Sequence, residues 1–220
     1  MKVLISGYGK MGHVVEQVLE RRGIPLAGAS EDVCAVDPAL ARECICIDFT
    51  TPAAFRANYP FLARAFKGVV VGTTGWDDIR PQVLRCFEQA GTPLIYASNF
   101  SIGVNALFAA VERAAGMLRG QGYTPSIEEV HHIHKLDAPS GTAKSLGVLV
   151  QKGLGVEPQI EAKRIGEVPG IHSVSFVSDC DRLDFRHEAF SREGLAQGAV
   201  AAALMLDGGV QGVHEFKDLL

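Results

Sequence analysis

Short apolar runs alternate with amphipathic stretches through the first hundred residues of the chain. The runs are apolar at nearly every position, which is typical of strands that are covered on both faces. Regular alternation of strand and helix predicts a parallel sheet with crossover helices. We expect strands at VLIS, PLAGAS, CICIDFT, VVVG and PLIYAS, helices at about residues 11–22 and 79–90, and a further amphipathic stretch between CICIDFT and VVVG.

The pattern changes after residue 100, where two runs, HSVSFVS and RLDFRHEAF, alternate apolar and polar residues with period two. Such alternation predicts a sheet that is open to solvent on one face. We therefore expect a second domain of the α+β class. Its other expected elements are a helix at about 103–118, the extended stretch SIEEVHHIHK, a turn at DAPSGT and a helix to about 152. The chain then ends in a helix from Gly194, which we expect to pack back on the first domain.

The first apolar run leads directly into GYGKMG, which places Gly7, Gly9 and Gly12 at the start of an amphipathic helix. Glycines in that setting permit a tight turn, close approach to a pyrophosphate and close packing of helix on strand, while the helix N-terminus supplies N–H donors. Glu31 and Asp32 follow about 20 residues later, where a carboxylate binds ribose hydroxyls. The sequence therefore predicts a dinucleotide site.

An acidic residue at that point repels a 2'-phosphate, so NADH is the favoured cofactor. Lys10 in the loop offsets part of the repulsion, and NADPH remains an alternative. Two further loops, GTTG at 72–75 and ASNF at 97–100, follow strands on the same expected rim and are candidates for contacts near the nicotinamide. The competing interpretation is that all three are ordinary turns with surface acids nearby.

Three of the seven histidines lie within four residues, in the stretch EVHHIHKLDAPSGTA. If the stretch is a strand, His131, Ile133 and Lys135 share one face. If it is a helix, His131 and Lys135 form an i, i+4 pair. In both cases the imidazole and the ammonium can face one cavity, as an acid and base or as an anion-holding pair.

A helix is expected to begin at the Pro-Ser-Gly-Thr turn of residues 139–142, so its free N–H groups and hydroxyls can converge on a carboxylate. A substrate with an acid group fits this arrangement. The alternative of a metal bound by His132 and His134 is disfavoured, because a lysine is adjacent and no carboxylate or cysteine completes a ligand set. We expect no metal; surface histidines beside a capped helix are the other competing interpretation.

The charge is close to balanced, with 21 basic and 25 acidic residues and a formal net charge of −4. It offers no electrostatic footprint for nucleic acid or an anionic membrane. The chain starts directly into MKVLISG, without the basic region of a signal peptide, and has no apolar stretch long enough to span a bilayer. We therefore expect a cytoplasmic protein whose partner is a small molecule.

The stretch EVHHIHKLDAPSGTA resembles the signature of the 4-hydroxy-tetrahydrodipicolinate reductase (dihydrodipicolinate reductase) family. The resemblance implies an NAD(P)H-dependent oxidoreductase of lysine and diaminopimelate biosynthesis, which reduces a cyclic dicarboxylate to tetrahydrodipicolinate with loss of water. It also implies a homotetramer. Other family features occur in the expected order over essentially the whole chain: GYGKMG, IDFT, GTTGW, SNFSIGVN, VPGIHSVSF and HEAFSREGLAQGA.

The resemblance implies an α/β fold, with a Rossmann-like dinucleotide-binding domain at 1–101 plus 195–220 and an α+β domain for substrate binding and oligomerisation at 102–194. In the motif, His131 would be the acid/base residue and Lys135 the proton donor. Substrate carboxylates would meet His132, Ser140, Gly141 and Thr142. The nucleotide would contact Gly7, Tyr8, Gly9, Lys10, Met11, Gly12, Glu31, Gly72, Thr73, Thr74, Ala97, Ser98, Asn99 and Phe100.

The chain departs from the family pattern in three places. The region 32–46 is short, so the second half of the nucleotide domain is expected to lack an element. The glycine loop is one residue shorter than in many relatives, and Asp32 stands where NADP-tolerant relatives often carry arginine. Two competing hypotheses are a nucleotide-binding regulator without catalysis and an oxidoreductase acting on an amino acid or semialdehyde. An intact His131 and Lys135 pair argues against the regulator.

Overall fold

The structure is a computed structural model that describes all residues, 1–220. The chain divides into two compact units. Unit 1 comprises Met1–Ser101 and Glu193–Leu220, and unit 2 comprises Ile102–Arg192. None of the helices combines the length and apolar character that a membrane span requires.

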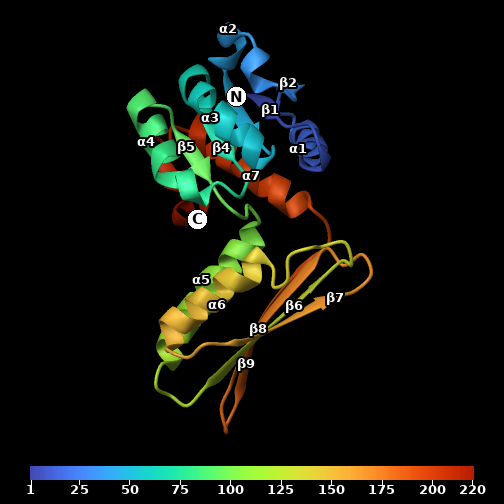
Figure 1. The fold of residues 1–220 in the computed structure, drawn as a ribbon, viewed down its shortest axis with the longest axis vertical. Coiled ribbons are helices and arrows are strands. Elements are labelled where there is room, and N and C mark those ends of the chain that lie inside the picture. Colours follow the sequence, from blue (N-terminus) through green and yellow to red (C-terminus); the bar gives the residue numbers. More distant parts are fainter. The chain divides into compact units, whose positions relative to one another are not determined.

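Unit 1 contains a six-stranded sheet in the order β10-β5-β4-β3-β1-β2, and every pair of neighbours is parallel (Figure 1). The chain winds outward from β1 to β2 and then continues on the other side of β1 with β3, so the winding switches between β1 and β3. This confirms the predicted parallel sheet. The strands are β1 (Lys2–Ser6), β2 (Leu26–Ser30), β3 (Cys44–Asp48), β4 (Gly68–Val71), β5 (Leu94–Tyr96) and β10 (Val213–Glu215).

Helices cover both faces of this sheet, which explains why β3 and β4 are buried at every residue. One face packs against α1 and α7, and its core includes Val15, Leu19 and Val200. The other face packs against α3 and α4 around Phe55 and Phe87. The bounds are α1 (Lys10–Arg21), α3 (Pro52–Ala65), α4 (Arg80–Ala90) and α7 (Glu193–Asp207).

The link between β2 and β3 contains no strand. It holds only the 3-10 turn η1 (Val33–Ala35) and the four-residue helix α2 (Pro38–Ala41). In the common doubly wound order 3-2-1-4-5-6, a third strand lies outside the second. That strand is absent here, so β2 forms the edge of the sheet. The short region 32–46 predicted a missing element, but the loss lies in the first half of the domain and not in the second.

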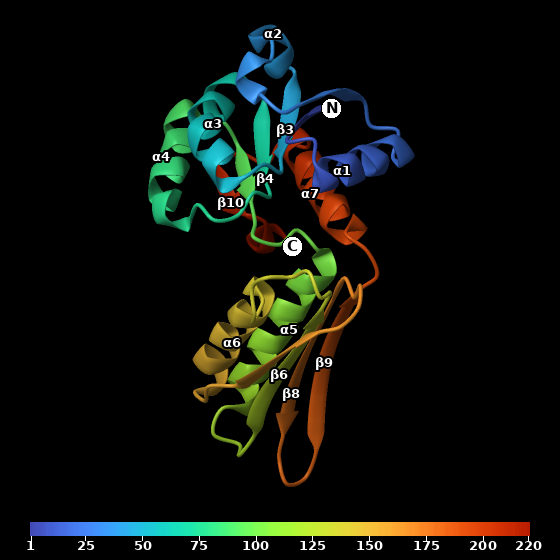
Figure 2. The same ribbon diagram turned by 45° about the vertical axis from the view of Figure 1, so that its right-hand side comes forward.

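Unit 2 contains a four-stranded sheet in the order β7-β6-β8-β9, with two helices against one face (Figure 2). β6 pairs in parallel with β7 and antiparallel with β8, and β8 pairs antiparallel with β9. The opposite face is polar, which confirms the predicted one-sided sheet. The elements are α5 (Ile102–Leu118), β6 (Thr124–His131), α6 (Gly141–Leu154), β7 (Gln159–Arg164), β8 (Gly170–Val177) and β9 (Arg182–Ala189).

Two predictions about local structure were incomplete. The extended stretch expected to reach Lys135 ends at His131, because the chain turns at Ile133 and the Lys135 N–H donates to the carbonyl of His132 at 3.1 Å. The strands β7 and β10 were not predicted: β7 is charged at half its positions, and β10 has only three residues. The remaining unit 1 elements are two 3-10 turns, η2 (Asp77–Ile79) and η3 (Phe216–Leu219); Phe216 is buried in the core of that unit.

Candidate functional site

The glycine loop of unit 1 has the space and the free donors that an anionic ligand needs. Gly7 has φ +86°, and a Cβ there would overlap the backbone of Phe49; a Cβ on Gly12 would lie 2.5 Å from the Gly7 carbonyl oxygen. Gly9 is the N-cap of α1 and would meet nothing within 4 Å. No side chain caps this helix, so its first N–H groups are available to a pyrophosphate.

A buried carboxylate ties the glycine loop to the loop after β4. Asp48, at the end of β3, accepts hydrogen bonds from Ser6 at 2.7 Å, from Thr73 at 2.5 Å and from Thr50. Burial raises the pKa of Asp48, and these hydroxyl donors oppose the rise. The structure therefore brings the predicted Gly72–Thr74 loop beside the predicted glycine loop.

The loop after β5 is fixed mainly by Phe100, which is buried and packs against Phe216 with the two rings tilted and their centroids 4.9 Å apart. Because this side chain is occupied in the core, a cofactor contact at Phe100 is left to its backbone. Ser98 is exposed, and Asn99 accepts a hydrogen bond from the Ser101 N–H at 2.8 Å. Ala97 is buried.

The two acidic residues after β2, Glu31 and Asp32, have different surroundings. The Asp32 carboxylate accepts from the Cys34 N–H at 3.2 Å and caps η1. Glu31 is exposed, and the structure gives its carboxylate no hydrogen-bond or ion-pair partner. Among the other predicted residues, Lys10 is exposed, while Tyr8 and Met11 pack partly against the core.

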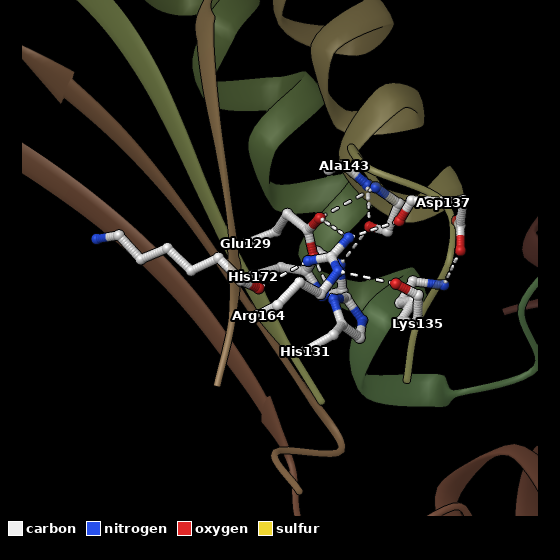
Figure 3. Close-up of polar contacts among 9 residues, drawn as sticks. Glu129, His131, Lys135, Asp137, Ala143, Arg164 and His172 are labelled. Carbon is white, nitrogen blue, oxygen red and sulfur yellow. Dashed lines mark hydrogen bonds and ion pairs between the residues drawn. The ribbon is translucent and has the colours of Figure 1, made fainter. Parts of the chain in front are cut away.

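In unit 2, one buried carboxylate joins three segments of the chain. Glu129 has no exposed surface, and its side chain lies on the same face of β6 as that of His131. It accepts hydrogen bonds from His131 Nδ1, from Arg164 of β7 at 2.9 Å and from the Ser140 N–H at 3.1 Å (Figure 3). Burial acts to raise the pKa of Glu129, but the donors from Arg164 and His131 outweigh it and lower the pKa.

His131 is a neutral base at neutral pH. Burial lowers its pKa, the Glu129 carboxylate opposes this, and the charges of Lys135 and Arg164 lower it further. Since an ionised carboxylate only accepts hydrogen bonds, His131 must carry its proton on Nδ1 and leave a lone pair on Nε2. A Cβ on Gly170 would lie 3.0 Å from this Nε2, so the glycine keeps it uncovered.

His172, on β8, completes the buried cluster. Its ring lies edge-on to that of His131 with centroids 5.1 Å apart, and its Nε2 lies 3.1 Å from the Ser140 hydroxyl. Burial, together with the nearby His131, lowers the pKa of His172 to about 4. The ring is therefore uncharged at neutral pH.

Lys135 lies in the loop between β6 and α6. Its ammonium forms an ion pair with Asp137 at 2.7 Å, which lowers the pKa of that carboxyl group. Arg164 donates to the carbonyl oxygens of Lys135 at 3.3 Å and Asp137 at 2.5 Å, and so holds the loop on β7. The charge of Lys135 contributes to lowering the pKa of His131, while the predicted joint action of the two residues stays a prediction.

The other two histidines of the stretch, His132 and His134, form no hydrogen bond with this cluster. His134 contacts Glu167 at 3.1 Å, with its ring 6.0 Å from that of His132. The Nδ1 atom of His132 is buried without a hydrogen-bond partner, and an acidic ligand would supply one.

The Ser-Gly-Thr turn begins α6. Ser140 is the N-cap: its hydroxyl accepts from the Ala143 N–H at 3.2 Å and contacts His172, and the residue is buried. These bonds engage the Ser140 hydroxyl within the protein, and its substrate contact stays a prediction. Gly141 is exposed, and a Cβ there would meet nothing within 4 Å, while Thr142 is half-buried.

Glu129, His131 and His172 each bring a ligand atom within 4.8 Å of the others, a spacing that a metal ion accepts. However, both carboxylate oxygens already accept hydrogen bonds, and the Arg164 guanidinium lies against one of them. A further cation would meet a positive charge and a protonated Nδ1. The cluster is better explained as a hydrogen-bonded network.

Sequence reasoning missed three members of this cluster. Glu129 precedes His131 by two positions, and the period of a strand would have placed it on the same face. His172 stood within the family feature VPGIHSVSF but carried no assigned role. Arg164 belongs to the strand that was not predicted, so no local pattern pointed to it.

Comparisons with known proteins agree along the whole chain. The family model described as "Dihydrodipicolinate reductase, N-terminus" matches residues 1–100, and "Dihydrodipicolinate reductase, C-terminus" matches residues 103–220. A protein of Christiangramia forsetii named 4-hydroxy-tetrahydrodipicolinate reductase is 37% identical over 100% of this chain and 98% of its own. Its namesake in Xanthomonas campestris pv. campestris is 38% identical over the same shares.

Among solved structures, dipicolinate-bound dihydrodipicolinate reductase from Paenisporosarcina sp. TG-14 has the same fold. The TM-score is 0.82 at 18% identity, over 100% of this chain and 99% of that one. Together with the family models and the relatives, this confirms the resemblance that the sequence motifs carry. The chain belongs to the dihydrodipicolinate reductase family.

Proposed function

We propose that the protein is a 4-hydroxy-tetrahydrodipicolinate reductase. It reduces the cyclic dicarboxylate to tetrahydrodipicolinate with NADH or NADPH and with loss of water, in lysine and diaminopimelate biosynthesis. The observation that carries the proposal is the cluster around Glu129, which joins a neutral His131, the loop of Lys135 and the Ser-Gly-Thr turn in one unit. A protein that only bound nucleotide would have no use for this arrangement.

The nucleotide is held by unit 1. The first N–H groups of α1 and the open space above Gly9 fit the pyrophosphate, and the free Glu31 carboxylate fits the ribose hydroxyls. We favour NADH because Glu31 repels a 2'-phosphate, with Lys10 as the feature that would let NADPH bind. When bound, the nicotinamide supplies the hydride that adds at C4 of the substrate ring.

The proton chemistry belongs to unit 2. Lys135 is the proton donor to the carbon next to the site of reduction, and its ammonium also stabilises negative charge that develops there. His131, with a lone pair on Nε2, relays protons or holds the substrate in place. One substrate carboxylate takes the place of Asp137 as the ion-pair partner of Lys135. Substrate carboxylates also accept hydrogen bonds from the buried Nδ1 of His132 and from Gly141 and Thr142 at the start of α6.

The assembly is proposed to be a homotetramer built on the polar face of the unit 2 sheet. This face carries carboxylates and basic groups side by side, such as Glu128 with Lys163 and Asp184 with Arg182. Such a mixed surface is self-complementary, as a symmetric interface requires. The proposed site of action is the cytoplasm, with a small-molecule substrate and no nucleic-acid or membrane partner.

A coupled assay tests the proposed function. The substrate is generated from pyruvate and aspartate semialdehyde by the preceding synthase, and nicotinamide absorbance is followed with NADH and NADPH separately. Oxidation should require both the synthase and this protein. Lys135→Ala should lower kcat by about 10²- to 10⁴-fold, the range for a positioned proton-transfer group, with unchanged NADH affinity. Lys152→Ala, which changes an exposed lysine of α6, is the matched control.

The alternatives give different outcomes in the same assay. A folded protein that binds NADH but oxidises it with no substrate is a regulator. Oxidation that appears only with amino acids or semialdehydes, and not with the synthase product, identifies a different oxidoreductase. Loss of NADH binding in Lys135→Ala would contradict the assignment of this residue to proton transfer.

A further inference from the structure

We infer that Glu129 and Arg164 are positioning residues of this site: Glu129 fixes the orientation and tautomer of His131, and Arg164 fixes the loop that carries Lys135. The inference rests on the proposed function, because it concerns the same reaction. Neither residue belongs to the set of substrate or nucleotide contacts given above. Both act through the two residues to which the proton chemistry is assigned.

Glu129 cannot reach a substrate itself. Its side chain has no exposed surface, and its two oxygens accept hydrogen bonds from His131, Arg164 and the Ser140 N–H. An unpaired carboxylate in this position would carry a large desolvation penalty, so these donors are required for it to remain charged. Since they come from β6, β7 and the start of α6, the carboxylate fixes three segments relative to one another.

The effect on His131 follows from the chemistry of the carboxylate. Because Glu129 only accepts, the imidazole is held with its proton on Nδ1 and its lone pair on Nε2. The charged and titratable groups that face this ring are Glu129, Lys135, Arg164 and His172. Of these, Glu129 is the one negative group, so it alone favours the protonated imidazole.

Arg164, which forms the ion pair with Glu129, also holds the loop that carries Lys135. Besides Glu129, its guanidinium donates to the backbone oxygens of Lys163 at 2.7 Å, Lys135 at 3.3 Å and Asp137 at 2.5 Å (Figure 3). The loop between β6 and α6 has no regular structure of its own, so these bonds set the position of Lys135. A lysine in place of Arg164 lacks the planar fork and cannot serve four acceptors at once.

The first test replaces the carboxylate by its neutral isostere, Glu129→Gln. The amide oxygen can still accept from His131 Nδ1, so the size of the side chain is kept while the negative charge is lost, together with the second acceptor that serves Arg164 and the Ser140 N–H. The NMR titration of the His131 ring should then move to lower pH than in the wild type. The corresponding limb of the pH profile of kcat should move in the same direction. We expect kcat at neutral pH to fall by about 10- to 100-fold, which is the usual loss when a carboxylate that orients a metal-bound histidine is removed.

Glu112→Gln is the control for the loss of one negative charge in unit 2. Glu112 is exposed on α5, and its replacement should leave the His131 titration unchanged. An unchanged titration and an unchanged pH profile in Glu129→Gln would overturn the inference for Glu129. The titration needs no substrate, so it decides this point even if the wild-type protein fails to reduce the synthase product, an outcome that would instead overturn the proposed function.

The second test is Arg164→Lys, which keeps a positive charge beside Glu129 but removes the planar guanidinium group. We expect kcat to fall about 10-fold or more while the dissociation constant of NADH stays constant. The control is Arg119→Lys, because Arg119 also donates to two backbone oxygens in unit 2, those of Lys152 and Gly153, at the far end of α6. Equal losses of activity and thermal stability in both variants would reduce Arg164 to a structural role and overturn the inference.

Discussion

The buried imidazole of His172 makes unit 2 sensitive to acid. Its pKa is about 4 in the folded protein, because of burial and the nearby His131, against an ordinary value of 6.5. Between these values the unfolded chain binds a proton that the folded chain does not, so stability is lost as the pH falls from about 6.5 towards 4. At pH 5 the loss from this residue alone is about 2 kcal/mol relative to pH 7.

Thermal unfolding of the wild type and of His172→Gln at both pH values measures this contribution. The glutamine amide can reach Ser140 in place of Nε2 but does not titrate. The wild type should therefore lose more melting temperature between pH 7 and pH 5 than the variant does. Parallel losses in the two proteins would contradict the prediction.

At this scale the sequence assigned roles to residues with obvious chemistry, and those roles stay predictions; it missed the residues that form hydrogen bonds with them in the structure. His131 and Lys135 were predicted to act together, and this stays a prediction; the charge of Lys135 is one of the smaller causes that lower the pKa of His131. Arg164 could not be predicted, because a single arginine in an unrecognised strand carries no local signal. Ser140 was predicted to contact the substrate, and its hydroxyl caps α6 in the structure, because helix capping and substrate binding can use the same residue type.

Helix α7 passes the loop that follows β5 at a point where only glycine fits. A Cβ on Gly198 would overlap the carbonyl oxygen of Phe100 in this loop. Gly198→Ala must therefore displace either the helix or the loop, at a cost of about 3 kcal/mol in the free energy of unfolding. Because the loop is a proposed nucleotide contact, NADH affinity should fall as well, as calorimetry would show.

The same helix supplies a control, Gly194→Ala. A Cβ there would meet the Ser101 hydroxyl at 3.8 Å, an ordinary contact, so the higher helix propensity of alanine should stabilise the protein by up to about 1 kcal/mol. If Gly198→Ala were as stable as Gly194→Ala, the close approach of α7 to the loop would be contradicted.

Most elements could be predicted because their hydrophobic period was strong. The buried strands of unit 1 and the alternating β8 and β9 were all found, and family resemblance accounted for the shortened link after β2. The end of β6 was misplaced because HHIHK has the composition of either a strand or a loop, and its turn is set by bonds to distant residues, such as that from the Ile133 N–H to the carbonyl of Gly166. Tertiary contacts of this kind leave no local pattern.

We proposed that the homotetramer forms through the polar face of the unit 2 sheet. Reversing charges on β9 tests this proposal. Arg182 and Arg186 are mostly exposed and, being four residues apart on one strand, lie on the same face. Changing both to glutamate should break the complementarity with the carboxylates of another copy. Light scattering should give a mass four times that of the 23.5 kDa chain for the wild type and a smaller assembly for the variant.

The control carries the same change of net charge on the helices of unit 2. Arg113→Glu with Lys152→Glu alters exposed residues of α5 and α6, away from the sheet face, and should leave the mass unchanged. Loss of assembly in both double variants would point to net charge, and retention in both would exclude the sheet face as the interface.

The core of unit 1 is discontinuous in the sequence, and this has a consequence for synthesis on the ribosome. Val200 and Phe216 close the face of the sheet that β1 and α1 leave open, yet they follow all of unit 2 along the chain. The N-terminal domain usually folds first during synthesis. Here unit 1 is completed only after all of unit 2 has been made. Unit 2 can be complete while Val3, Ile5 and their neighbours still lack their cover, so the growing chain exposes an apolar surface until Val200 and Phe216 have been made.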